Sequence, residues 1–197
     1  RKNLVEKAEW LMQHIREKEK ILPRLAPAFY PYTFFMVDQF YISKASAWSS
    51  GYDPEVEQSA YAGYNASLVA YKHFYDMDEA AQYAYSRSVI AILMTKNYTQ
   101  VKDSEYNDFY QYSQEQYGIY PDYENTPLEV GFLETFRYDW VRSFYDKKYD
   151  LLAYVMEVFA LTKEEFDEKY DKELYPLVHQ KKEALVKIFE RLGVKVY

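Results

Sequence analysis

The 197-residue sequence contains no cysteine, five glycines and three histidines. Without cysteine there is neither a disulfide framework nor a thiolate metal site. The scattered glycines cannot form a glycine-rich phosphate loop, and the common nucleotide-binding and serine-hydrolase motifs are absent. No histidine follows a glutamate at the spacing used by di-iron bundles, and no H-E-x-x-H occurs. We therefore expect a protein that is not an enzyme and needs neither a metal nor a cofactor.

Long apolar runs are also missing. The longest purely aliphatic run, residues 89–94 (VIAILM), is far shorter than the roughly 20 residues of a membrane-spanning helix. No signal-peptide pattern is found before Leu4. The sequence is therefore expected to form a soluble chain, long enough for one domain or for a domain with an extended arm.

Aromatic residues are abundant, with 24 tyrosines and 12 phenylalanines. Seven of them crowd into residues 23–41, together with prolines at positions 23, 27 and 31. Each proline lacks an amide donor, so a preceding helix is expected to end here and the chain to bend. Burying five of these rings would contribute on the order of 10 kcal/mol. The segment therefore needs a partner surface, either in its own chain or on another.

The net charge of −7 is distributed unevenly. Residues 1–24 carry seven basic against four acidic side chains, whereas residues 49–160 carry eight basic against eighteen acidic ones. Residues 177–197 are basic again, with five against two. An acidic body of this kind is unsuited to binding polyanions with its whole surface. Any contact with nucleic acid is therefore expected at the chain's basic ends.

Apolar residues recur at helical spacing along most of the chain. A strand is the alternative interpretation of the VIAILM run, although its alanine-rich flank favours a helix. Asp76 is expected to cap a helix, Thr162 to begin one with a capping box, and Gly118 and Gly193 to end helices. The segments predicted as helices are residues 3–21, 32–50, 54–75, 77–96, 104–117, 126–148, 150–161 and 163–192, the last interrupted at Pro176.

These patterns predict an all-α fold. Its first part, residues 1–50, is expected to be an extended N-terminal helical arm with a turn rich in proline and aromatic residues. The second part, residues 51–197, is expected to be a compact helical bundle. In the helix predicted over residues 126–148, Phe132, Phe136, Trp140 and Phe144 follow one another at four-residue spacing and are expected to face the core.

The order of these parts, and the string SQEQYGI at residues 113–119, resemble the major coat (capsid) proteins of filamentous and rod-shaped archaeal DNA viruses, of the lipothrixvirus and rudivirus type. The resemblance implies a structural coat protein whose arm helices wrap double-stranded DNA in the A form. It also implies self-assembly into a helical filament, pairing with a second related coat protein and, in enveloped members, a lipid envelope outside. The protein would then be located in the virion, and in the host cytoplasm during assembly.

Two sets of residues are predicted to serve this role. Stacking on bases is disfavoured, because the aromatic segment lacks interleaved arginine and lysine. Contacts to phosphates are therefore assigned to Arg1, Lys2, Lys7, Arg16, Lys18, Lys20, Arg24 and Lys44. Contacts between subunits are assigned to Phe29, Tyr30, Tyr32, Phe34, Phe35, Phe40, Tyr41 and Trp48. The charge of +3 over residues 1–24 is small for a DNA-wrapping arm, so a partner coat protein could neutralise more of the phosphates.

Two other interpretations remain open. The chain could be a soluble all-α interaction or regulatory protein without nucleic-acid contact, its aromatic segment folded back on its own bundle. It could also be a helical enzyme that uses a pocket lined by carboxylates. Acidic clusters at residues 53–57 and 76–79 could hold a hard cation, although at helix starts they more simply complement the helix dipole. The discriminating observation is whether the first fifty residues pack on their own body.

Overall fold

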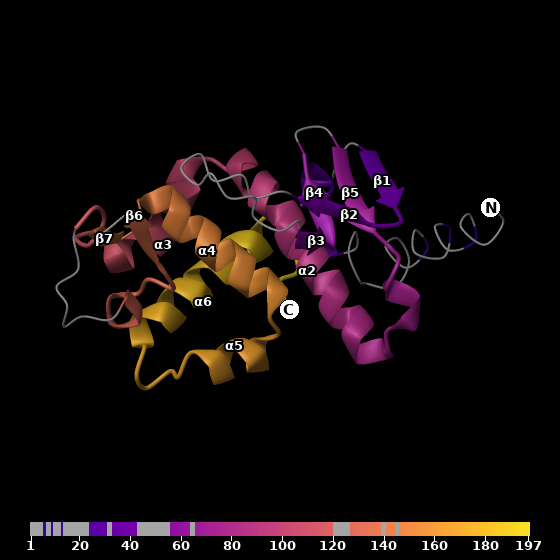
Figure 1. Cartoon of the computed structure of the whole chain (residues 1–197). Coiled ribbons are helices and arrows are strands. Elements are labelled where there is room, and N and C mark those ends of the chain that lie inside the picture. Colours follow the sequence, from indigo (N-terminus) through magenta and orange to yellow (C-terminus); the bar gives the residue numbers. More distant parts are fainter. Residues whose placement is uncertain are drawn as a thin grey trace.

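A computed structural model describes residues 6, 9, 13, 24–30, 33–42, 56–63, 66–119, 127–138, 141–144 and 146–197. The fold is mixed, with strands and helices both contributing, so the prediction of an all-α fold is wrong. Figure 1 shows helix α2 between the strands of the first half of the chain and the helices of the second half. The helix predicted over residues 3–21 lies almost entirely outside the described residues.

Short strands occupy the region where two helices were predicted, over residues 32–50 and 54–75. They are β1 (Thr33–Val37), β2 (Phe40–Ile42), β3 (Val56–Gln58), β4 (Ala60–Ala62) and β5 (Ala66–Ala70). Burial alternates along β4, where Ala60 and Ala62 are buried and Tyr61 is exposed. The small residues of this region thus repeat with the strand period of two, and the aromatic residues of β1 and β2 favour strands.

The strand order explains how the first half of the chain is held together. Strand β5 lies between β1 and β4, parallel to β1 and antiparallel to β4, while β2 pairs antiparallel with β3. After β5, the amides of Tyr71 and Lys72 donate to the carbonyls of Val37 and Asp38 at 3.0 and 2.9 Å. The predicted arm and the predicted bundle therefore share their strands, because β1 and β2 pair with β5 and β3.

The second half is mainly helical. Its helices are α2 (Glu79–Asn97), α3 (Asn107–Tyr110), α4 (Lys147–Ala160), α5 (Lys163–Lys169) and α6 (Pro176–Arg191). Short 3-10 turns are η2 (Pro27–Phe29), η3 (Phe74–Asp76), η4 (Tyr98–Gln100), η5 (Asp103–Tyr106), η6 (Gln111–Ser113) and η7 (Pro127–Val130). The helix predicted over residues 126–148 is wrong, because β6 (Thr135–Tyr138) and β7 (Val141–Phe144) form an antiparallel hairpin there. The β-branched and aromatic residues of this segment favour strands.

Helix boundaries follow the capping rules at several positions. Thr162 and Glu165 form the predicted capping box, with hydrogen bonds of 2.7 and 3.1 Å. The cap of α2 is Asp78 rather than Asp76, and its carboxylate accepts from the amide of Ala81 at 2.8 Å. The predicted helix over residues 77–96 is confirmed by α2, so the strand alternative for the VIAILM run is wrong.

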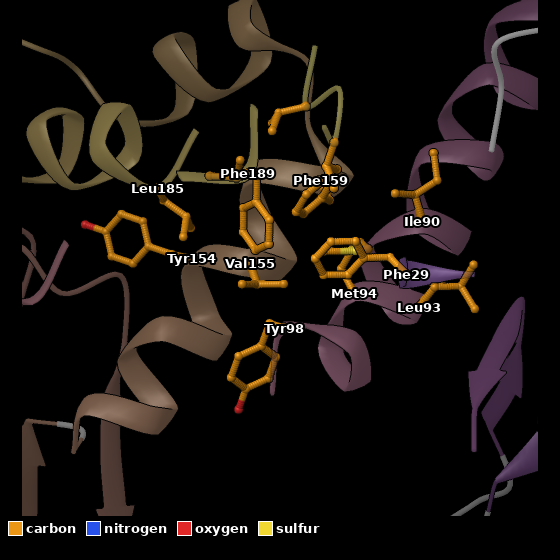
Figure 2. Close-up of a cluster of buried hydrophobic side chains, with 14 of the residues drawn as sticks. Phe29, Ile90, Leu93, Met94, Tyr98, Tyr154, Val155, Phe159, Leu185 and Phe189 are labelled. Carbon is orange, nitrogen blue, oxygen red and sulfur yellow. The ribbon is translucent and has the colours of Figure 1, made fainter. Parts of the chain in front are cut away.

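The main core lies where α2, α4 and α6 meet. Figure 2 shows Ile90 and Met94 of α2 on the side of the rings of Phe159 and Phe189, within one buried cluster. These two rings come from α4 and α6, and their centroids lie 5.1 Å apart. The core thus joins residues separated by a hundred positions in the sequence.

The described segment 24–30 packs on the rest of the same chain. Leu25 and Phe29 are buried, and the ring of Phe29 lies 6.4 Å from that of Phe189 (Figure 2). The side-chain amide of Asn97 donates to the carbonyl of Phe29 at 2.8 Å. Burying Leu25 and Phe29 contributes about 2 kcal/mol each. These contacts correct the prediction of an extended arm, because part of the aromatic segment finds its partner surface in the same chain.

Candidate interaction surface

One face of the β1–β5–β4 sheet carries a row of exposed apolar side chains. Phe35 of β1 pairs with Leu68 of β5, and Leu68 pairs with Tyr61 of β4. Because side chains alternate between the faces of a sheet, residues paired across strands share a face. Phe35 is 53% exposed and Tyr61 is 45% exposed, with Leu68 half-buried between them. We call these three residues the aromatic row.

The opposite face of the same sheet belongs to the core. Ala60, Ala62, Ser67 and Val69 are buried there, and β4 packs against α2. On the face of the aromatic row, the alternation also places threonine, valine and alanine. None of the three strands contains a charged residue. Antiparallel sheets with one solvated face usually place polar residues on it. An uncharged apolar face is therefore a candidate contact surface.

The predicted subunit-contact residues separate into three groups. Phe29 is buried in the chain's own core and therefore cannot reach a neighbouring molecule. The exposed members are Tyr30 at 41%, Phe35 at 53% and Tyr41 at 45%, while Phe34 and Phe40 are half-buried. Tyr32 and Trp48 lie outside the described residues.

Of the residues predicted to contact nucleic acid, the structure describes Arg24. Its side chain is 5% exposed, and its Nε donates to the carbonyl of Lys195 at 3.2 Å while its Nη2 donates to that of Val196. A guanidinium in this position does not suit contact with a duplex backbone. The other seven, Arg1, Lys2, Lys7, Arg16, Lys18, Lys20 and Lys44, lie outside the described residues.

A buried ionic network lies between the helices. The Nζ of Lys181 donates to the carboxylate of Asp150 at 2.6 Å, to the carbonyl of Gly131 at 2.8 Å and to the hydroxyl of Ser113 at 3.2 Å. The hydroxyl of Tyr117 donates to the same Asp150 oxygen at 2.6 Å. Lys181 is 0% and Asp150 1% exposed. The network thus connects α4 and α6 with the segments around η6 and η7.

Burial is the first cause of the pKa shifts in this network. It lowers the pKa of Lys181 to about 8, against the opposing attraction of Asp150, and it raises the pKa of Asp150 against the opposing effect of Lys181. The rings of Phe109, Phe132 and Tyr154 lie 4.6, 4.7 and 4.8 Å from the ammonium. These contacts favour the ion pair at neutral pH, and complete burial indicates a structural rather than a catalytic role.

Sequence reasoning missed this network, although a signal for it exists. In α6, Lys181 falls between Val178 and Leu185 at helical spacing and so lies on the apolar face of the helix. A lysine on such a face needs a buried partner. Asp150 is that partner, and Tyr117 donates to the same carboxylate oxygen.

The described residues also contain a small cavity of about 270 Å³ beside η4 and η5. Tyr98, Tyr106, Tyr110, Asp103 and Lys148 contribute to its walls, and the hydroxyl of Tyr110 donates to Asp103 at 3.0 Å. Ligand pockets usually enclose about 300–1,000 Å³. Its small size gives no basis for assigning a ligand.

The described residues contain no group of three or more histidine, aspartate or glutamate side chains placed to hold a metal ion. In the same part of the chain, every helix is too short or too polar to cross a membrane. These findings leave the aromatic row as the surface feature that most needs an explanation.

Comparisons with protein-family models, with curated proteins and with solved structures find no match to this chain. The fold and the surface therefore define only a class, a small mixed α/β domain with one uncharged apolar sheet face. The resemblance to archaeal viral coat proteins stays a prediction.

Proposed function

We propose that this protein is a structural subunit that assembles with copies of itself through the aromatic row. The observation that carries the proposal is the exposure of Phe35 and Tyr61 on either side of Leu68, on a sheet face without charged strand residues. Such a face selects an apolar partner, because it offers no ion pairs to a charged one.

A second copy of the same row is a suitable partner. Two identical apolar faces can pack about a twofold axis without any further matching of charge. Aromatic side chains bury 150–250 Å² each, so half-exposed Phe35 and Tyr61 offer roughly 200 Å² per copy. A standard interface buries about 800 Å² per partner. The row is therefore only one part of a contact of standard size.

A contact of this size suits repetition in a larger assembly. Each contact would be weak alone, and repeated contacts gain strength because later ones form within an assembled particle. A twofold contact by itself closes at a dimer, so a filament also requires a second, head-to-tail contact elsewhere on the subunit. The proposal thus keeps the subunit-contact part of the coat-protein hypothesis without the all-α fold or the extended helical arm.

Double-stranded DNA is the finer part of the proposal. Its support is the basic balance of residues 1–24 and the family resemblance, and seven of the eight predicted phosphate contacts lie outside the described residues. If the hypothesis is correct, DNA should promote assembly by concentrating subunits along one polymer.

The test compares the native chain with the Phe35→Ser/Tyr61→Ser double variant. Light scattering and electron microscopy would follow particle formation, with and without a DNA duplex. We expect native assemblies to form and the double variant to remain small, because it loses the apolar contact while its core is untouched. The matched control is Leu174→Ser, which removes an apolar side chain that is 65% exposed in the segment between α5 and α6.

Equal assembly of the double variant and the native chain would exclude the aromatic row as the contact. A native chain that stays monomeric with and without DNA would favour the alternative, an interaction protein whose partner is a different molecule. Assembly that is unchanged by DNA would keep the self-association and remove the nucleic-acid part of the proposal.

A further inference from the structure

Two arginines are buried together beside the last residues of the chain. Arg24 is 5% exposed, and Arg87 of α2 is 1% exposed. Arg24 donates to the carbonyl of Val196, and the ring of the next residue, Tyr197, lies 5.8 Å from the Cζ of Arg87. Residues from the two ends of the described chain thus meet at α2.

The hydrogen bonds of both guanidinium groups go mainly to backbone carbonyls. Arg87 donates to Val158 and Ala160 at 3.4 Å each and to Leu161, all at the C-terminal end of α4. It also donates to the hydroxyl of Tyr83 at 3.5 Å. Carbonyls at a helix C-terminus carry partial negative charge, which compensates part of the charge of Arg87.

This compensation is incomplete. None of the ion pairs found among the described residues includes Arg24 or Arg87. Among the described residues, no hydrogen-bond acceptor contacts the buried Nη1 of Arg24. Buried charges are normally paired, because removing them from water is costly otherwise. Two buried cations and an unused donor therefore make this a suitable place for an anion.

The electrostatic surroundings of Arg24 support this interpretation. Burial is the first cause that lowers the pKa of Arg24 to about 10, and the second cause is the positive charge of Arg87. The phenols of Tyr83 and Tyr197 have smaller effects in the opposite direction and raise the pKa of Arg24. The positive charge of Arg87 thus adds to the cost of burying Arg24.

We propose that Arg24 and Arg87 form a binding site for a small oxyanion of the phosphate class. Guanidinium groups bind phosphate oxygens through paired, charge-assisted hydrogen bonds. Tyr83 and Tyr197 lie over Arg87 and are 43% and 41% exposed, so their rings form the boundary between the site and solvent. Displacement of the Tyr197 ring would open the site to a small ion.

This site is independent of the aromatic row and of self-assembly. Phosphate could come from the free ion or from a nucleic-acid backbone, which offers the same oxygens. The burial of both arginines favours the free ion, because a duplex cannot reach under the two rings. The experiment therefore includes both sources.

Isothermal titration calorimetry of the full chain would use sodium phosphate against sodium chloride at matched ionic strength. We expect phosphate to bind the native chain. In Arg24→Gln, which removes the charge and keeps a polar side chain, the dissociation constant should be at least tenfold larger. Arg191→Gln is the matched control, because it removes an exposed cation paired with Glu105 at 2.9 Å. Tyr197→Ala should bind phosphate at least as tightly as the native chain, since it opens the site.

A second measurement covers the case in which Arg24→Gln does not fold. Hydrogen exchange of the native chain would report the amide of Lys195, which donates to the carbonyl of Arg24 at 2.8 Å. We expect phosphate, and not chloride, to slow this exchange several-fold. No heat and no slowing at phosphate concentrations up to about 50 mM would overturn the proposal. Equal binding by Arg24→Gln would also overturn it, as would binding of a DNA duplex, but not of phosphate, that depends on Arg24.

Discussion

At the residue scale, the main feature is a pair of opposite charges, Lys181 and Asp150, buried in the interior of this small domain. Lys181 and Asp150 are completely buried and meet at 2.6 Å, with Tyr117 donating to the same carboxylate. A buried pair of this kind is sensitive to the loss of one partner, because the remaining charge stays in a medium of low polarity. The pair therefore fixes the relative positions of α4 and α6.

Replacing one member of the pair should lower the free energy of unfolding much more than replacing both. We expect Lys181→Met to lower the free energy of unfolding by about 3–5 kcal/mol, because it leaves Asp150 charged and unpaired. The Asp150→Leu/Lys181→Met double variant should recover most of this loss. Urea denaturation monitored by circular dichroism measures both. A single variant as stable as the native chain would show that the pair is not ionised.

The same lysine predicts a pH dependence. Its pKa is about 8 in the folded chain, below its ordinary value of 10.5, so the unfolded state binds more protons between these values. The contribution of Lys181 to stability therefore rises from about pH 8 toward pH 10. Buried tyrosines such as Tyr154 have raised pKa values and act in the opposite direction above pH 10. Denaturation curves from pH 7 to pH 10 should show the rise in the native chain, and Lys181→Met should lack it.

At the scale of elements, local capping and periodicity made the longer helices α2, α4 and α6 predictable, whereas the helix predicted over residues 104–117 is mostly 3-10 turns around the four-residue α3. The helix predicted over residues 77–96 matches α2, and the capping box at Thr162 and the proline at the start of α6 are present. These features are local, because each depends on residues within one or two helical turns. They could therefore be recognised without knowing what packs against them.

The strands were not predicted, for a physical reason. Tyr61, Leu68 and the alanines around them fit either helical or alternating spacing over such short segments, and pairing with distant strands decides between the two. For the same reason, the partners of the buried Arg24 and Lys181 could not be predicted from the sequence around them. Nothing near Arg24 or Lys181 in the sequence shows that their partners lie at Val196 and Asp150.

The capping box provides a prediction at this scale. Thr162→Ala should lower the free energy of unfolding by about 1 kcal/mol, because the amide of Glu165 loses its acceptor. Thr99→Ala is a suitable control, since the Thr99 hydroxyl donates to a carbonyl of the preceding turn and does not cap a helix start. Thermal unfolding of both variants measures the difference. Equal effects would remove the special role of the capping box.

At the scale of the whole molecule, the N-terminal and C-terminal parts of the described chain stabilise each other. Phe29 packs against Phe189, and the backbone of Lys195 pairs with that of Arg24. Phe29→Ala should therefore destabilise the domain by about 3–5 kcal/mol, the usual loss for a buried ring. Phe35→Ala, which truncates an exposed ring, should change stability by less than about 1 kcal/mol. Chemical denaturation of the two variants checks this contrast, and equal losses would contradict the assignment of Phe29 to the core and Phe35 to the surface.

The whole account depends on what covers the aromatic row. Sedimentation equilibrium of the purified native chain, over a wide range of concentration and without DNA, addresses this most directly. We predict an average mass that rises with concentration above that of the monomer, and no such rise in the Phe35→Ser/Tyr61→Ser variant. A native chain that remains a monomer throughout, with the same mass as the variant, would contradict the proposal.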